Sequence, residues 1–146
     1  VNKKIRAVLE NEMIPIFCIG EELAIREAGT HVEHVLTQVR QGLQGFHKPE
    51  LKKIVFAYEP VWAIGTGKVA TAEEAHQVAS AIRAALNDNF GDNAANSRIL
   101  YGGSVKANNV AGFLQSDQVD GVLVGGASLD AEEFAGISRF KKHIVL

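Results

Sequence analysis

The chain has 146 residues, of which 47% are hydrophobic and 22% charged, and its formal net charge is −2. This composition excludes a disordered chain, and the interspersed charges exclude the clustered Lys and Arg of a nucleic-acid-binding surface. No apolar stretch approaches the roughly 20 residues that span a membrane, and the single cysteine, Cys18, cannot form an internal disulfide. We therefore expect one globular domain over residues 1–146, in the cytoplasm, with neither a nucleic-acid nor a membrane partner.

Short β-rich runs alternate with helical patterns along the chain, which is typical of a parallel sheet with crossover helices. A first helix is predicted over residues 3–11, with no strand before it. Four strands follow, at residues 14–19, 54–58, 98–101 and 121–124. The apolar residues of 54–58 run in succession rather than in alternation, which predicts a strand that is buried on both faces.

Two of the crossover helices begin with the spacing of a capping box, in which a Thr and a Glu three residues later bond each other's backbone. These pairs are Thr30 with Glu33 and Thr71 with Glu74. Apolar stripes at helical spacing follow them: Val32, Val35, Leu36, Val39 and Leu43 after the first, and Ala75, Val78, Ala79, Ile82 and Leu86 after the second. Shorter helices are predicted at 108–114 and 131–140. Because the units share no repeated side-chain pattern, a solenoid is disfavoured.

One carboxylate stands at the point where a predicted strand becomes a loop. Glu59 ends the strand 54–58 and precedes Pro60, which restricts Glu59 to an extended conformation. Residues 61–64 are then apolar, although loops are usually polar, and an exposed apolar run indicates a surface that covers something. Taken alone, Glu59 fits a solvated glutamate at a strand end better than a catalytic residue, but with this loop beside it the pattern favours a base under a lid.

Two pairs of glycines follow successive strands, at residues 102–103 and 125–126, and Ser104 adjoins the first pair. Glycines let backbone N–H groups approach an anion, and a following helix N-terminus favours negative charge. Each pair could also be a simple tight turn. Since the carboxyl ends of parallel strands meet at one face, we expect Glu21, Glu59, the lid and both turns to gather there.

Residues 57–68, which read AYEPVWAIGTGK, match the signature of the triosephosphate isomerase family over its whole length. Residues 15–21, 101–105 and 123–129 match further segments in the family's order. The chain thus resembles the C-terminal half of that enzyme, from the helix after strand 4 through helix 8. The resemblance implies parallel (β/α) units of a TIM barrel, strands 5 to 8 only.

The resemblance also implies an activity and a role for each site residue. The reaction is the isomerisation of glyceraldehyde 3-phosphate and dihydroxyacetone phosphate through an enediolate, a step of glycolysis and gluconeogenesis, with Glu59 as the base. Neither a cofactor nor a metal is expected. The substrate phosphate would bind at Gly65, Ser104, Gly125 and Gly126. The lid would comprise Pro60, Val61, Trp62, Ala63, Ile64, Thr66, Gly67 and Lys68, with Tyr101 and Ser104 supporting it by hydrogen bonds.

The resemblance leaves part of the family's catalytic set outside this sequence. Longer members supply an asparagine, a lysine and a histidine from their N-terminal half, and none of the five histidines here is expected to replace that histidine. The sequence begins at Val1 without a secretory leader pattern, and we expect a fragment. Its expected partners are the triose phosphate and either the N-terminal half or a second copy, since full-length members are homodimers. The alternatives are a non-catalytic, self-assembling half-barrel with residual phosphate binding, and another phosphate-binding barrel enzyme.

Overall fold

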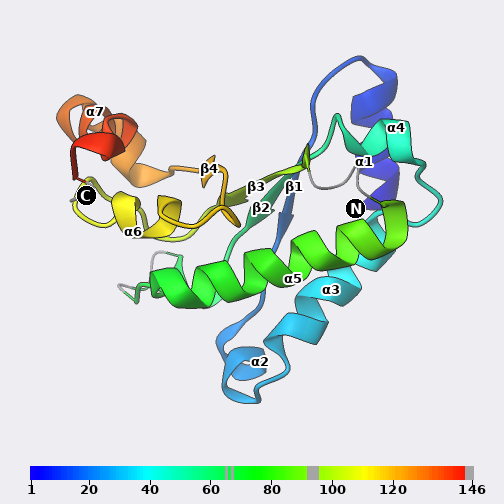
Figure 1. The fold of residues 1–146 in the computed structure, drawn as a ribbon, viewed down its shortest axis with the longest axis horizontal. Helices are drawn as coiled ribbons and strands as arrows, with labels where there is room; N and C mark the ends of the chain where they lie inside the picture. The colour runs from blue at the N-terminus through cyan, green and yellow to red at the C-terminus, as the bar shows by residue number, and fades with distance from the viewer. Residues whose placement is uncertain (65, 67, 92–95, 144–146) are drawn as a thin grey trace.

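The computed structural model describes residues 1–64, 66, 68–91 and 96–143, without the side chains of residues 142 and 143. Its centre is a four-stranded parallel sheet in which the strands follow one another in chain order (Figure 1). The strands are β1 (Ile16–Ile19), β2 (Val55–Tyr58), β3 (Arg98–Tyr101) and β4 (Gly121–Val122). The sheet is open, with β1 and β4 at its edges, and the predicted parallel α/β class is confirmed.

Helices connect the strands of this sheet. They are α1 (Asn2–Glu10), α2 (Leu23–Glu27), α3 (His31–Gly42), α4 (Lys48–Leu51), α5 (Ala72–Phe90), α6 (Val110–Leu114) and α7 (Ala131–Ser138), with single turns of 3₁₀ helix at η1 (Val61–Ala63), η3 (Gly126–Leu129) and η4 (Phe140–His143). The short helices α2 and α4 were not predicted. Within the described parts of the chain, no helix combines the length and apolarity needed to cross a membrane.

One face of the sheet carries the hydrophobic core. Helices α3 and α5 lie side by side against it (Figure 1), and alternate strand residues point toward them. The buried strand residues are Phe17, Ile19, Phe56, Tyr58, Ile99 and Tyr101. All five apolar residues predicted for α5 are buried. In α3, Val35, Val39 and the C-cap Leu43 are buried, while Val32 and Leu36 are half-buried and pack at the margin of the core.

The opposite face of the sheet is partly uncovered. Ile16 and Cys18 of β1 point to this face and are exposed, and Leu100 of β3 is half-buried on it. In contrast, all four residues of β2 are buried, including Val55 and Ala57 on this face, as predicted from its continuous apolar run. Apolar side chains therefore remain in contact with solvent along the β1 edge.

The clearest differences between prediction and structure are at two strands and at one helix cap. The first strand begins at Ile16 rather than at residue 14, and Ile14 is 62% exposed. The fourth strand is only Gly121–Val122, because the chain turns into η3 after Leu123 makes its last bond to the Tyr101 carbonyl. The capping box at Thr30 is wrong: Thr30 does not adopt the extended conformation of an N-cap, and its hydroxyl donates to the carbonyl of Ile25 instead.

Candidate active site

Glu59 lies directly after β2, in a narrow slot between the two neighbouring strands. Its backbone N–H donates to the carbonyl of Ile19 at 2.8 Å. On the β1 side, a Cβ placed on Gly20 would lie 1.7 Å from the Glu59 carbonyl oxygen; on the β3 side, a Cβ on Gly102 would lie 2.6 Å from Glu59 Cγ. Because neither glycine carries a side chain, both backbones can approach Glu59 closely, and together they define its position.

The thiol of Cys18 lies beside the Glu59 carboxylate. Partial burial raises the pKa of Cys18 above its usual range, and the charge of Glu59 and a hydrogen bond to it raise this pKa further. The sequence analysis did not predict this proximity. It follows from the register, because Cys18 precedes the end of β1 by one residue and points to the open face of the sheet.

Glu21 is fully buried and links three aromatic and basic groups at the base of the loop 60–68. Its Oε1 accepts hydrogen bonds from the Tyr58 hydroxyl at 3.1 Å and from Trp62 Nε1 at 2.8 Å, and Arg26 lies 3.6 Å away. Burial raises the pKa of Tyr58, and the carboxylate of Glu21 adds to this effect. Glu21 was predicted to lie at the face of the sheet that carries the site; it is buried there, and its hydrogen bond connects Trp62 of the loop to the end of β1.

The first half of the predicted lid is tethered at several points. The Ser104 hydroxyl donates to the carbonyl of Ala63 at 2.9 Å, and the Thr66 hydroxyl donates to that of Trp62 at 2.7 Å. Pro60 and Ala63 are buried, whereas Val61, Ile64, Thr66 and Lys68 are exposed. The predicted lid residues Gly65 and Gly67 lie outside the described residues. The Ser104 contact agrees with a lid-supporting function, which stays a prediction.

The two glycine turns come together around one cavity of about 280 Å³. It is lined by residues 102–106 of the first turn, by Gly125, Gly126 and Ala127 of the second, and by Ile64 of the lid. Three of the four predicted phosphate-binding positions, Ser104, Gly125 and Gly126, therefore share a cavity, while Gly65 lies outside the described residues. Lys106 also lines the cavity and was not predicted, although a cation two residues after Ser104 was a visible signal.

Tyr101 lies below this cavity rather than within it. Its ring is fully buried and stacks on Phe113 at a centroid distance of 4.0 Å. Burial raises the pKa of Tyr101 to about 12, although the backbone N–H of Ala70, which faces the hydroxyl, opposes the shift. Among the described residues, the hydroxyl has no partner at full hydrogen-bonding geometry. Support of the lid by Tyr101 stays a prediction.

No described histidine lines the cavity of the glycine turns. His76 pairs with the carbonyl of Phe113, His34 contacts Gln38, and His47 is exposed. His31 lies at the start of α3, and the side chain of His143 is not among those that the structure describes. These positions agree with the expectation that the histidines are surface or packing residues.

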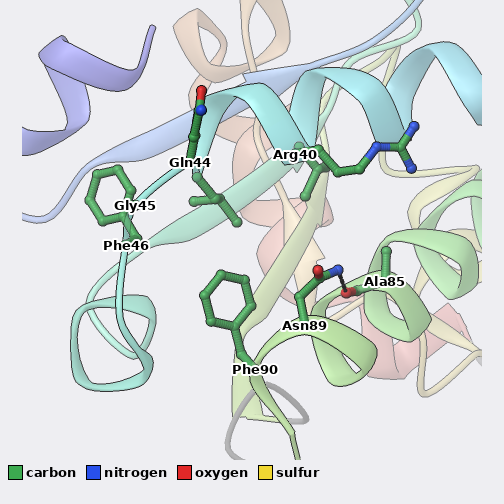
Figure 2. A pocket seen from close by; sticks show the side chains of 9 residues that line it. Arg40, Gln44, Gly45, Phe46, Ala85, Asn89 and Phe90 are labelled. Atoms are coloured by element: carbon green, nitrogen blue, oxygen red, sulfur yellow. Dashed lines mark hydrogen bonds between the residues drawn. The ribbon is translucent and has the colours of Figure 1, made fainter.

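A second cavity, of about 340 Å³, lies between the C-terminal ends of α3 and α5 (Figure 2). The rings of Phe46 and Phe90 line it. Two of its polar side chains are already engaged, since Arg40 pairs with Glu33 and Asn89 donates to the carbonyl of Ala85. This cavity therefore offers an apolar surface without a free charge, and it is a poorer anion site than the glycine turns.

The sequence is similar to known proteins over nearly its whole length. The sequence model described as triosephosphate isomerase matches residues 1–141. The triosephosphate isomerase of Saccharopolyspora erythraea is 53% identical over 139 residues, which are 94% of this chain and 53% of that relative. Those of Streptomyces avermitilis and Corynebacterium glutamicum are 54% and 55% identical, over 97% and 94% of this chain and 55% and 54% of the relatives. The chain thus spans about half the length of the curated relatives it matches.

Proposed function

This chain belongs to the triosephosphate isomerase family, and from that premise we propose that it supplies half of an enzyme interconverting glyceraldehyde 3-phosphate and dihydroxyacetone phosphate. The half we propose is the C-terminal one. Support comes from the order of the segments 15–21, 57–68, 101–105 and 123–129, which is the order of that half in the family. In this proposal residues 1–146 belong to a single barrel domain, in which the missing strands bridge β4 and β1.

The observation that carries the catalytic part of the proposal is the placement of Glu59 between Gly20 and Gly102. A base that takes a proton from carbon needs a fixed position and restricted access to water, since both increase its effectiveness. Glu59 would remove a proton from the carbon next to the substrate carbonyl, which gives an enediolate. The same carboxylic acid would then return the proton to the neighbouring carbon. The electrophile and the substrate-orienting lysine would come from the other half.

The phosphate of the substrate would occupy the cavity between the two glycine turns. Gly125 and Gly126 are exposed there, and η3 begins at Gly126, so that backbone N–H groups are available to an anion. Lys106 adds a positive charge to the cavity wall. Closure of the lid over this phosphate would exclude water and protect the enediolate from losing it.

The test is an isomerase assay of the chain alone, with a separately expressed N-terminal half of a relative, and with the C-terminal half. We expect activity only with the N-terminal half. Glu59→Gln should lower kcat by about 10²- to 10⁴-fold, the usual contribution of a general base. The matched control is Glu27→Gln, since Glu27 is exposed on α2. Complementation by the C-terminal half, or an undiminished rate in Glu59→Gln, would refute the proposal.

A second candidate is a non-catalytic half-barrel that assembles with its own copies. The exposed Ile14 and Ile16 at the β1 edge favour it, because an unpaired edge strand with apolar side chains promotes association. Sedimentation of the chain, with and without the N-terminal half, distinguishes the two candidates. A stable homo-oligomer that the complement does not dissociate, and that lacks isomerase activity, would favour this second function.

A further inference from the structure

Gln38 of α3 binds the backbone of Gly20 with both ends of its side-chain amide. The N–H of Gly20 donates to Gln38 Oε1 at 2.9 Å, and Gln38 Nε2 donates to the carbonyl of Gly20, also at 2.9 Å. Gly20 lies just beyond the last paired residues of β1 and β2, Ile19 and Tyr58. The amide of Gln38 thus binds both backbone polar groups of Gly20, while Ile19 and Glu21 on either side accept hydrogen bonds from Glu59 and Val61.

His34, one turn earlier on α3, supports this arrangement. Its Nε2 lies 3.0 Å from Gln38 Nε2. Because the two groups of Gly20 fix the orientation of the amide, the second N–H of Gln38 Nε2 faces the ring and His34 Nε2 accepts it. Gln38 is therefore held in one rotamer from two directions, and a side chain with a fixed rotamer can hold its partner accurately.

Gly20 is in turn the surface against which the backbone of Glu59 rests. The space that a Cβ on Gly20 would take is filled by the Glu59 carbonyl, only 1.7 Å from that position. The backbone carbonyl of the next residue, Glu21, accepts a hydrogen bond from the N–H of Val61 at 3.0 Å at the start of the lid. A shift of Gly20 would therefore move both the base and the first residues of the lid.

We propose that Gln38 is a positioning residue for Glu59, acting through Gly20 without touching the substrate. The catalytic consequence rests on the function proposed above, whereas the effect on the position of Glu59 does not. If Gln38 only stabilised the loop 20–22, its replacement would leave Glu59 in the same position. The two possibilities differ in kcat and in the environment of the Cys18 thiol.

The variants are Gln38→Ala, which removes both hydrogen bonds, and Gln38→Glu. The second keeps the size of the side chain but replaces the donor that faces the Gly20 carbonyl with an acceptor. Gln77→Ala and Gln77→Glu are the matched controls, because Gln77 is exposed on α5. Circular dichroism checks each fold, and loss of helical signal in both Gln38 variants would make Gln38 a folding residue and overturn the proposal.

Kinetics of the enzyme reconstituted from both halves give the first result. Since a misplacement of about 1 Å can cost 10²-fold, we expect kcat to fall at least about tenfold in both Gln38 variants while KM changes less than twofold. The Gln77 variants should match the parent. If kcat in the Gln38 variants stays within twofold of the parent, the proposal is wrong.

A second measurement applies to the 146-residue chain itself and needs no activity. Cys18 is the only cysteine, so the pH dependence of its alkylation by iodoacetamide reports the thiol beside Glu59. We expect the midpoint to fall in Gln38→Ala, since a displaced carboxylate no longer disfavours the thiolate. Gln38→Glu is not used here, because it adds a carboxylate to a pocket that Cys18 also lines. If the reconstituted parent is inactive, the proposed function fails, and an unchanged alkylation midpoint would then separately overturn the positioning function of Gln38.

Discussion

Replacing Gly102 with alanine should displace Glu59 without removing any functional group. The new Cβ would lie 2.6 Å from Glu59 Cγ and 3.1 Å from its Oε1, whereas ordinary contacts begin at 3.4 Å. The side chain of Glu59 must therefore retreat by about 0.8 Å, which is close to the 1 Å misplacement that can cost 10²-fold in rate. Gly102 does not have the left-handed backbone that favours glycine, so the Cβ is the whole perturbation.

The assay is steady-state kinetics of the enzyme reconstituted from both halves. We expect kcat of Gly102→Ala to fall about 30- to 100-fold, with KM changed by less than about threefold, since the phosphate contacts are retained. The matched control is Gly112→Ala in α6, where the Cβ would meet that of Ala72 at an ordinary 3.6 Å. A correctly folded Gly102→Ala with kcat within threefold of the parent would refute the claim that this slot places the base.

Three further predictions concern the cap of α5 and the thiol beside the base. Thr71→Ala should lower the free energy of unfolding by about 1 kcal/mol, because the Thr71 hydroxyl accepts a hydrogen bond from the Glu74 N–H. Thr30→Ala should lower it little, because Thr30 makes no cap bond. Equal losses for the two variants in denaturant titrations would contradict this prediction. Partial burial raises the pKa of Glu74, but the Thr71 N–H and Arg26 lower it more, so that its contribution to stability should be lost as the pH falls through that lowered value. Glu74→Gln should flatten the acid limb of a pH–stability curve, and an unchanged limb would rule this out. Glu59→Gln should increase the alkylation rate of Cys18 at a fixed pH near 8.5, because the carboxylate no longer raises the pKa of the thiol; a slower reaction would contradict the placement of the two groups.

Local patterns predicted those parts of the fold that depend on local interactions. The box of Thr71 and Glu74 and the apolar stripe behind it predicted α5, because a cap and a helical face involve residues close in sequence. The same spacing failed at Thr30, where the chain leaves α2 in a compact turn and the hydroxyl finds the carbonyl of Ile25 first. Glu33 is bound instead by Arg40, one of the longer side chains of the same helix.

In the candidate site, too, features that follow from local patterns were predicted and long-range contacts were not. Glu59 and the two glycine turns were predicted because parallel strands bring their carboxyl ends to one face. The contact of Gln38 with Gly20 spans 18 residues, and that of Trp62 with Glu21 spans 41, so no local spacing signals either of them. The proximity of Cys18 and Glu59 depends on the pairing register of β1 and β2, which sequence periodicity alone does not fix.

The strand order has a consequence for how the chain acquires its structure. Every strand pairs with the next strand along the chain, so each pairing closes only one crossover connection. Short closures keep the contact order low for a parallel sheet, and low contact order accelerates folding. During synthesis β2 can dock on β1, and β3 on β2, before later segments leave the ribosome. Among the described strands, only the outer edges of β1 and β4 then remain without a neighbouring strand.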